Sequence, residues 1–433
     1  MASALENFVN NVRTLSASEN FVELVRYLNK SIDLLAKNWS ILDNVLETLD
    51  MQQHTLGVLY VLLAKFLSIS PTAQSTDITP LLNLTKDFIC LCNRDQIRNT
   101  GAVQSYYEMC HNYTNEIISD PTKCLQGIPV LMQAIENIRT VSTQLTPIHA
   151  DLCQISLKAK CFNRALKYLN ADITEIATTE DIHSDSKYFL LYYYYGGMIY
   201  TAMKNYERAL YFYEVALSTP ALTMSYIMLE AYKKFILVAL ILNGRLIVLP
   251  KYPSQVISRF LKPLCQPYQE LATAFNNSTC EDVRTVINKH SDTFVRDQTM
   301  GLVKIVSYSL YKKNIQRLTK TFLTLSLADV AHRVQLPSAI DAETYILNMI
   351  KSGEVYATIN QKDGMVVFKD NPEKYDSADR FLKIQEDMNS VMELNKRIKK
   401  MEEEVKLNPM FIKKSVTQED ELSSKTIVKH FTQ

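Results

Sequence analysis

Residues 355–368 read Val-Tyr-Ala-Thr-Ile-Asn-Gln-Lys-Asp-Gly-Met-Val-Val-Phe and break the helical periodicity on either side of them. In this stretch Val355, Ala357 and Ile359 alternate with polar or aromatic neighbours, which is typical of a half-buried strand. Residues 360–364 supply a turn, and residues 365–368 return as a second apolar run. The stretch therefore predicts a two-stranded hairpin.

Three apolar helix faces precede this hairpin. The helix-start signals Ser326-Leu327-Ala328-Asp329 and Ser338-Ala339-Ile340-Asp341 separate them, and Lys351-Ser352-Gly353 stops the last one. The faces comprise Ile315, Leu318, Phe322 and Leu325, then Leu327, Val330, Ala331 and Val334, then Ala342, Tyr345, Ile346, Met349 and Ile350. Three short helices followed by a hairpin predict a winged helix over residues 310–370.

A long helix is predicted after the hairpin, over residues 376–406. Its apolar residues recur at steps of three and four on an otherwise polar helix: Ile384, Met388, Val391, Leu394, Ile398, Met401 and Val405. Such a narrow stripe needs partner helices in a coiled coil or bundle. Packing against the chain's own body is the alternative. The remaining residues, 407–433, are acidic and rich in serine, and are predicted to be disordered.

Upstream of the winged helix, the chain predicts consecutive antiparallel helices. Residues 160–166 are echoed by residues 204–210, and the second copy fits a tetratricopeptide-like frame. In that frame Gly197 and Ala209 allow two helices to approach, and Tyr200 and Tyr213 fill the groove between them. The predicted fold is therefore mainly α: an irregular tetratricopeptide-like helical-repeat solenoid, then a winged helix, then a long C-terminal helix. The repeats divide into an N-terminal arm, residues 1–190, and a second helical part, residues 191–309.

Four consecutive tyrosines at residues 192–195 allow two interpretations. Aromatic residues at helical spacing usually fill a core, and this is the interpretation we favour. A ligand-stacking surface is the alternative.

Composition excludes several protein classes. Only 9 glycines and 13 prolines interrupt 433 residues, which favours long helices over strands and tight turns. Lys and Arg number 47 against 46 Asp and Glu, so there is no basic excess of the kind that nucleic-acid binders carry. The N-terminal residues do not resemble a signal peptide, and no apolar run is long enough to span a membrane. Eight scattered cysteines indicate reduced thiols rather than a disulfide framework.

The motifs of common enzyme sites are missing from the sequence. No two of the seven histidines are closer than 34 residues, so no local two-histidine metal motif exists. No Gly-x-Ser-x-Gly elbow or glycine-rich phosphate loop occurs either. Three weak constellations remain: Cys90-x-Cys92 with Cys110-His111, the pair Cys153 and Cys161, and His149-Ala150-Asp151. Structural roles are the favoured interpretation of all three, and no catalytic residue, metal or cofactor is predicted.

Nucleic-acid binding is a possible use of a winged helix, whose third helix would enter the major groove. Here that helix carries Asp341 and Glu343, a late Lys351 and no arginine. Lys312, Lys313 and Arg317 on the preceding helix leave a phosphate contact open as the alternative. A hairpin edge can instead recruit a strand of another protein. The residues predicted to do so are Val355, Tyr356, Ala357, Thr358, Ile359, Met365, Val366, Val367 and Phe368.

Helical repeats, a winged helix and a long terminal helix, in that order, resemble the PCI family. This domain is shared by the proteasome lid, the COP-9 signalosome and eukaryotic translation initiation factor 3. Residues 192–200, 205–214, 312–322 and 359–365 are similar to the signalosome branch. The resemblance implies a non-catalytic scaffold subunit in the nucleus and cytoplasm. Its partners would be other PCI subunits and a metalloprotease subunit that removes the ubiquitin-like modifier from cullins, and so regulates cullin-RING ligases.

In PCI subunits of this type, the winged helices associate into a horseshoe and the terminal helices gather in one bundle. The resemblance therefore assigns residues 355–359 and 365–368 to horseshoe contacts and residues 384–405 to the bundle. No nucleic acid or membrane is expected as a partner. A lid or initiation-factor scaffold remains the alternative within the family, and a winged-helix nucleic-acid binder the alternative outside it.

Overall fold

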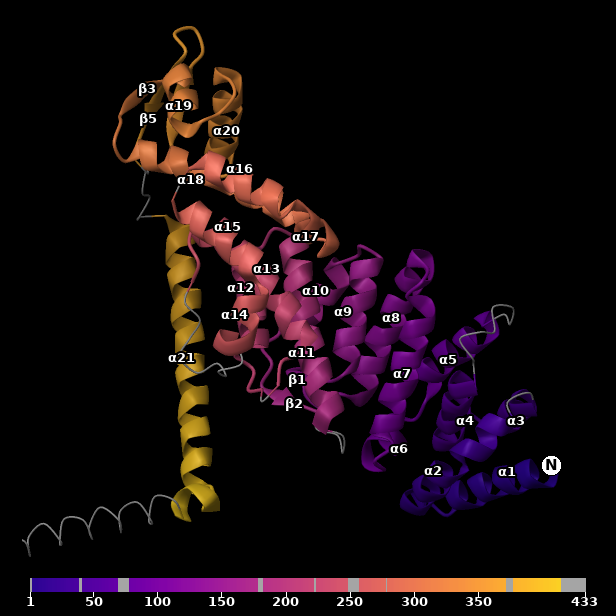
Figure 1. The fold of residues 1–433 in the computed structure, drawn as a ribbon. Helices are drawn as coiled ribbons and strands as arrows, with labels where there is room; N and C mark the ends of the chain where they lie inside the picture. Colours follow the sequence, from indigo (N-terminus) through magenta and orange to yellow (C-terminus); the bar gives the residue numbers. More distant parts are fainter. Residues whose placement is uncertain are drawn as a thin grey trace, which may run out of the picture. The chain divides into compact units, whose positions relative to one another are not determined.

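The computed structural model describes residues 2–38, 41–68, 78–177, 182–221, 223–247, 257–277, 279–370 and 377–413 (Figure 1). Helices dominate these residues, which confirms the predicted mainly α fold. Two compact units make up the chain. The larger comprises Met1–Thr321 and Ala328–Tyr345, and the smaller comprises Phe322–Leu327 and Ile346–Gln433. The finer predicted division, with boundaries at residues 190, 309 and 370, stays a prediction.

Most of the larger unit is a stack of short helices, each packed on neighbours in the chain. The first part of the stack consists of α1 (Ala2–Ala17), α2 (Phe21–Lys37), α3 (Leu42–Thr48), α4 (Thr55–Ser68), α5 (Thr79–Leu91), α6 (Arg94–Asn99), α7 (Val103–Ile117), α8 (Pro121–Ile138), α9 (Ile148–Lys158) and α10 (Asn163–Leu169). The second part consists of α11 (Ile182–Ala202), α12 (Tyr206–Ser218), α13 (Tyr226–Asn243), a π-helical turn (Ile257–Leu261), α14 (Lys262–Leu264), α15 (Gln266–Asn276), α16 (Cys280–Lys289), α17 (Ser291–Arg296) and α18 (Met300–Thr319).

Backbone geometry supports the predicted repeat. Lys160, between α9 and α10, and Lys204, between α11 and α12, both have positive φ, at 53° and 62°. The next N–H in each copy bonds the carbonyl five residues earlier, Cys161 to Ser156 and Asn205 to Tyr200, at 3.0 Å. This is the Schellman arrangement, which reverses the chain and satisfies carbonyls at a helix end. Two positions 44 residues apart therefore make the same turn.

The predicted small residues lie where two helices approach closely. A Cβ on Gly197 of α11 would lie 2.6 Å from Cε1 of Tyr213 on α12. Ala209 and Tyr213 are both fully buried. The close packing of α11 on α12 therefore requires glycine at this position.

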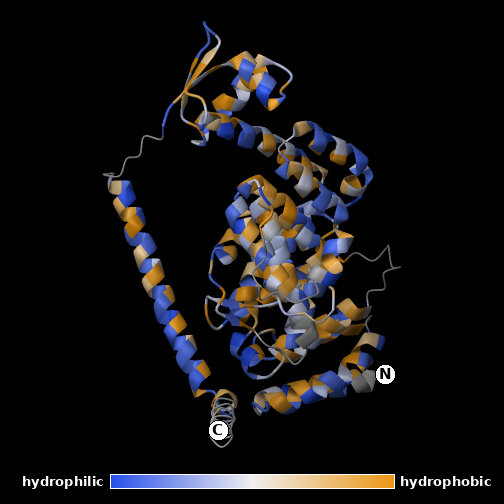
Figure 2. Ribbon diagram, turned by 60° about the vertical axis from the view of Figure 1, so that its left-hand side comes forward, coloured by the Kyte–Doolittle hydropathy of each residue, from blue (hydrophilic) through white to orange (hydrophobic). Residues whose placement is uncertain are grey.

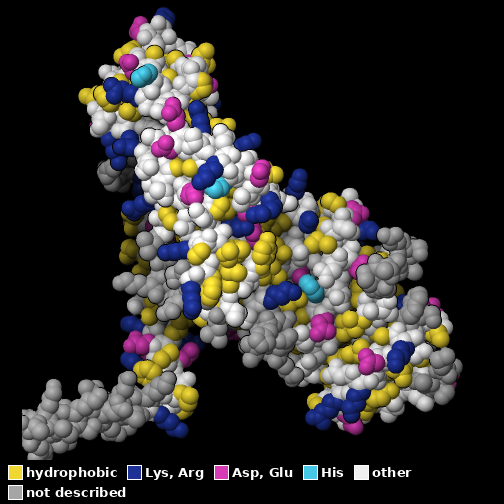
Figure 3. Space-filling model, viewed as in Figure 1, with side chains coloured by type: hydrophobic (Ala, Val, Ile, Leu, Met, Phe, Trp, Pro, Cys, Tyr) yellow, Lys and Arg dark blue, Asp and Glu magenta, His cyan; other side chains and the backbone are white. Residues whose placement is uncertain are grey.

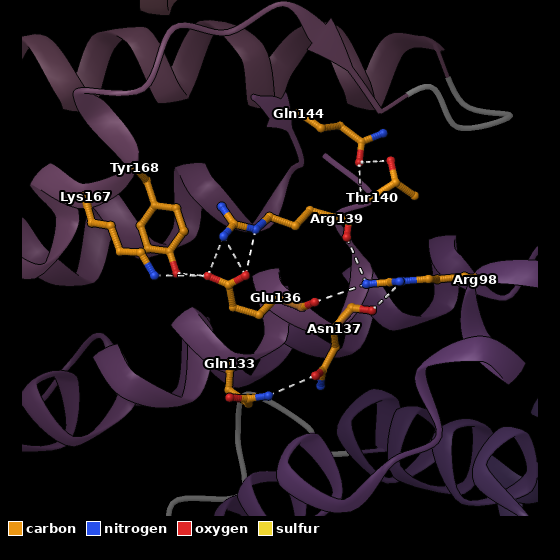
Figure 4. Close-up of polar contacts among 9 residues, drawn as sticks. All are labelled: Arg98, Gln133, Glu136, Asn137, Arg139, Thr140, Gln144, Lys167 and Tyr168. Carbon is orange, nitrogen blue, oxygen red and sulfur yellow. Dashed lines mark hydrogen bonds and ion pairs between the residues drawn. The ribbon is translucent and has the colours of Figure 1, made fainter. Parts of the chain in front are cut away.

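Polar contacts join α6, α8 and α10 (Figure 4). The guanidinium of Arg98 donates to the carbonyls of Asn137 at 2.8 Å, Glu136 at 3.1 Å and Arg139 at 2.8 Å, so it caps the C-terminal end of α8. The carboxylate of Glu136 accepts from Arg139 and from Tyr168 of α10. These contacts fix α6 and α10 on the end of α8.

The helical-hairpin prediction missed one short sheet. Strands β1 (Gln144–Leu145) and β2 (Glu175–Ile176) pair in parallel, with Gln144 opposite Glu175. Each strand has only two residues, too few for an alternating pattern to be visible in the sequence.

The predicted winged helix has its elements in the predicted order, with one strand added. Strand β3 (Thr324–Ser326) follows α18, then come α19 (Leu327–Val334), α20 (Ala339–Lys351), β4 (Ala357–Asn360) and β5 (Met365–Phe368). The helix starts are also confirmed: the Asp341 N–H donates to Ser338 Oγ at 3.2 Å. The first helix face was predicted too long, because α18 ends at Thr319 and Leu325 lies in β3.

The smaller unit contains a three-stranded antiparallel sheet of order β3-β5-β4. Leu325 lies opposite Val366, which in turn lies opposite Ile359. The predicted two-stranded hairpin is therefore correct for β4 and β5 but incomplete, since β3 occupies the second side of β5.

Helix α21 (Ala378–Leu407) confirms the predicted terminal helix. Ser377 Oγ caps it by accepting from the Arg380 N–H at 3.4 Å. Asn408 then caps a further turn of residues 408–413, a part of the predicted disordered tail. Residues 414–433 of that tail, and residues 371–376 of the linker before α21, lie outside the described residues.

Candidate assembly surfaces

Strand β4 forms one edge of the sheet, and its backbone geometry identifies the groups at that edge. The Lys369 N–H donates to the Tyr356 carbonyl at 2.8 Å. The backbone N–H and C=O groups of Tyr356, and of every second residue after it, therefore point toward β5. Backbone groups alternate sides in an antiparallel ladder. The N–H and C=O groups of Ala357 and Ile359 therefore point away from β5, toward the open side of the sheet.

The nine predicted wing residues do not form one surface. Val355, Val366 and Phe368 are buried, whereas Ala357, Ile359 and Met365 are half-buried. Tyr356, Thr358 and Val367 are exposed, and Thr358 lies directly opposite Val367. Because β5 has a strand on each side, only the β4 part of the predicted set lies at a sheet edge.

The apolar stripe of α21 is fully accessible. No α21 side chain is buried, and every stripe residue is more than half exposed, from 53% for Val405 to 64% for Val391. The exposed apolar residues also include Phe381, Leu382 and Met392, so the accessible face is wider than the predicted stripe. Figure 2 shows hydrophobic and hydrophilic residues mixed along the whole helix, and Figure 3 shows apolar side chains between charged ones on its surface.

Ion pairs on the polar side of α21 follow helical spacing. Arg397 with Glu393 at 2.8 Å and Lys406 with Glu402 at 2.7 Å are i,i+4 pairs. Such exposed pairs contribute little to stability, because water and salt screen the two charges. These ion pairs favour the helical conformation of α21 but bury no apolar surface.

The exposed residues of α20 include two large aliphatic side chains. Ile340 is 74% exposed and Leu347, two turns later, is 42% exposed. A helix that enters the major groove needs donors for base edges and cations for phosphates. Thr344, Asn348 and Lys351 of this helix are exposed as well, so a single late lysine is its exposed cation. The exposed aliphatic residues suit contact with a protein.

The weak cysteine and histidine constellations have structural environments. Cys92 and Cys110 are buried and Cys90 is exposed, and burial raises the pKa of Cys92 to about 11. His111 Nδ1 instead lies 3.1 Å from the buried carboxylate of Asp151. His149 Nδ1 accepts from the Thr146 N–H at 3.1 Å. Across the described ranges, no three His, Cys, Asp or Glu side chains are grouped as a metal site would require.

The tyrosine run belongs to the core. Tyr192 and Tyr193 are buried, and the Tyr192 hydroxyl donates to the Tyr168 carbonyl at 3.2 Å. Tyr194 is half-buried and its hydroxyl accepts from Lys234 Nζ at 2.8 Å. These contacts favour core packing over the alternative of a ligand-stacking surface.

A buried charge network was missed from the sequence. Lys233 Nζ lies 2.7 Å from Glu230 on the same helix and 2.8 Å from Asp297, which follows α17. All three side chains are nearly inaccessible to solvent. The only signal was a Glu and two Lys inside the otherwise apolar residues of α13, which had no assigned partner.

No helix within the described ranges combines the length and apolarity needed to cross a membrane.

Comparisons with known proteins cover nearly the whole chain. A family described as "COP9 signalosome complex subunit 3, N-terminal helical repeats" matches residues 18–257, and the PCI domain family matches residues 287–370. COP9 signalosome complex subunit 3 of Drosophila melanogaster is 57% identical over 98% of this chain and 97% of its own length. The Dictyostelium discoideum protein of the same name is 36% identical over 86% of this chain and 87% of its own length. The chain therefore belongs to the COP9 signalosome complex subunit 3 family.

Proposed function

We propose that this chain is a non-catalytic scaffold subunit of a COP9 signalosome. In this role it supports removal of the ubiquitin-like modifier from cullins, and so regulates cullin-RING ubiquitin ligases. Its partners are other PCI subunits and the metalloprotease subunit of the same complex, in the nucleus and cytoplasm. The family relationship supports the signalosome over the proteasome lid and translation initiation factor 3.

The exposed apolar face of α21 carries the proposal. A thirty-residue helix with no buried side chain lacks the tertiary packing that stabilises most helices. Burying one large aliphatic side chain gains about 1.5–3 kcal/mol. The seven stripe residues therefore represent a large stabilisation that only other helices can supply. We assign this face to a helical bundle formed with partner subunits.

The β4 edge is the second proposed contact. Its outward backbone groups at Ala357 and Ile359 can add a strand from a neighbouring subunit. The exposed Ile340 and Leu347 of α20 support a protein partner for the winged helix.

Co-purification of the tagged full-length chain from cells tests both contacts. We expect the unmodified chain to recover PCI subunits and a metalloprotease, together with cullin-deneddylation activity. The combined change Ile384→Asp, Val391→Asp and Ile398→Asp places charges in the stripe, and should remove most of the recovered subunits. The matched control, Gln385→Ala with Lys399→Ala on the same helix, should recover the complete set.

The sheet edge is tested separately by Ala357→Pro, which removes one outward N–H, with Thr358→Ala as its control. We expect Ala357→Pro to lose a neighbouring subunit while the bundle partners are retained. Recovery of the unmodified chain alone, or together with nucleic acid, would contradict the scaffold proposal.

A further inference from the structure

An open groove of about 690 Å³ is lined by residues of the larger unit alone, whereas α21 and β4 belong to the smaller unit. Helix α18 forms one wall. The other wall comes from α16 and from the turn between α19 and α20. Its floor and walls include three tyrosines, Tyr308 and Tyr311 of α18 and Tyr345 of α20. Its volume is within the range of protein ligand sites.

The three tyrosines form one aromatic cluster. The ring centroid of Tyr345 lies 6.2 Å from that of Tyr308 and 5.6 Å from that of Tyr311. Tyr308 is 55% exposed and Tyr345 is half-buried, whereas Tyr311 is buried, so the Tyr308 ring is the one most available to a ligand. The cluster thus combines flat apolar faces with polar ends.

The charges that line the groove favour an anionic ligand. Lys304 and Arg284 are both exposed. Arg284 also donates to the Tyr311 hydroxyl at 2.5 Å, which holds the guanidinium on this wall. Among the described residues that line the groove, Asp341 is the one carboxylate, and it accepts a hydrogen bond from Ser338 Oγ at 2.8 Å, at the start of α20. An acidic group on the ligand would complement the two cations.

The dimensions and chemistry of the groove suit an extended peptide rather than a helix. From Met300 to Tyr311 the α18 wall is about 16 Å long, at 1.5 Å per residue. A polyproline II segment of about five residues spans that length at 3.1 Å per residue. Its carbonyls make no internal hydrogen bonds, and the lining includes donors in Asn288 and Ser291. A docked helix would instead need a mainly aliphatic floor.

We propose that this tyrosine groove binds a short, extended, proline-rich segment of a partner protein, with an acidic residue beside the prolines. Tyrosine faces accept prolyl rings, as in other aromatic-lined grooves that recognise polyproline II segments. Lys304 and Arg284 select the acidic residue. This contact is independent of the α21 stripe and the β4 edge, so it recruits a client protein to the scaffold rather than assembling it.

Fluorescence anisotropy with the purified full-length chain tests the proposal. The probe is a labelled peptide of prolines and leucines with an aspartate at each end. One comparison peptide carries lysines in place of the aspartates, and another carries alanines in place of the prolines. We expect saturable binding of the acidic proline peptide, and binding of both comparison peptides at least about tenfold weaker.

Two variants locate the site. Tyr308→Ala removes the exposed ring and should weaken binding about tenfold, while the exposed Tyr226→Ala outside the groove should not change it. Lys304→Glu should weaken the aspartate peptide and strengthen the lysine peptide, whereas Lys320→Glu, at the end of the same helix, should do neither. Because all four positions are exposed, circular dichroism and thermal unfolding should match the unmodified chain.

Equal binding of the aspartate and lysine peptides would overturn the charge assignment. Preferential binding of the alanine peptide would overturn the extended conformation in favour of a helix. No saturable binding of any peptide, with the variants folded, would overturn the proposal. None of these results affects the co-purification test of the scaffold role.

Discussion

Helices α13 and α21 are both rich in aliphatic residues, yet they have opposite environments. In α13 Phe235, Ile236 and Val238 are buried, and even Glu230 and Lys233 are nearly inaccessible. In α21 no residue is buried. The apolar residues of α13 are thus packed inside the larger unit, whereas those of α21 have no core within the smaller unit. Substitutions in the two helices should therefore have very different consequences for the stability of the isolated chain.

Removing a buried charge gives the largest expected contrast. Lys233→Ala removes the nearest cation from Glu230 and Asp297. Lys234 remains 3.6 Å from Glu230 and Arg296 remains 3.7 Å from Asp297, so we expect a cost of about 3 kcal/mol in the free energy of unfolding, at the low end for breaking a buried pair. The matched change in α21, Lys400→Ala, removes an exposed i,i+4 pair with Glu404 and should cost less than about 0.5 kcal/mol. Urea denaturation of both variants measures the difference. Similar losses would show that α13 and α21 do not differ as described.

Acid should destabilise the helical repeats through His149. Burial lowers the pKa of this histidine from its ordinary 6.5 to about 4. Between those values the unfolded chain binds a proton that the folded chain does not, so the free energy of unfolding falls as the pH drops from 6.5 to 4. Above pH 6.5 His149 is neutral in both the folded and the unfolded chain, so its contribution to the free energy of unfolding no longer changes with pH. The slope is at most about 1.4 kcal/mol per pH unit, or about 3 kcal/mol over the window.

Urea denaturation at several pH values, with His149→Gln as the comparison, measures this contribution. The charged residues facing His149 are Arg139 and Glu136, whose effects on its pKa are opposed and smaller than that of burial. We expect a smaller pH dependence in the variant between pH 4 and 6.5. Identical profiles for the two proteins would assign the acid sensitivity to other groups.

Adding one methyl group gives the smallest expected effect. Gly197→Ala places a Cβ 2.6 Å from the ring of the buried Tyr213, and overpacking of this kind costs about 1–3 kcal/mol. Gly301→Ala, in the first turn of α18, meets no atom within 4 Å and should be neutral or slightly stabilising. The unfolding temperatures of the two variants compare a position packed between two helices with a position on an uncovered helix surface. A neutral Gly197→Ala would show that α11 and α12 can separate at little cost.

Local sequence patterns determined much of this protein. The period of three to four residues located the helices, and Ser338 marked the start of α20. The alternation at residues 355–359 located the hairpin. Gly197 identified the close helix pair because only a residue without Cβ fits there. The stripe on α21 was likewise visible, since amphipathicity depends only on the spacing of residues within one helix.

Only the tertiary structure decided which surfaces remain exposed. Residues 324–326 have too short a pattern to predict β3, and its pairing with β5 is what leaves β4 as the edge available at Ala357 and Ile359. Lys233 pairs with Asp297, 64 positions away, and the tyrosine groove brings together residues of α16, α18 and α20. A sequence records which side chains can be buried or charged. Their partners depend on contacts between distant segments, which exist only once the chain is folded.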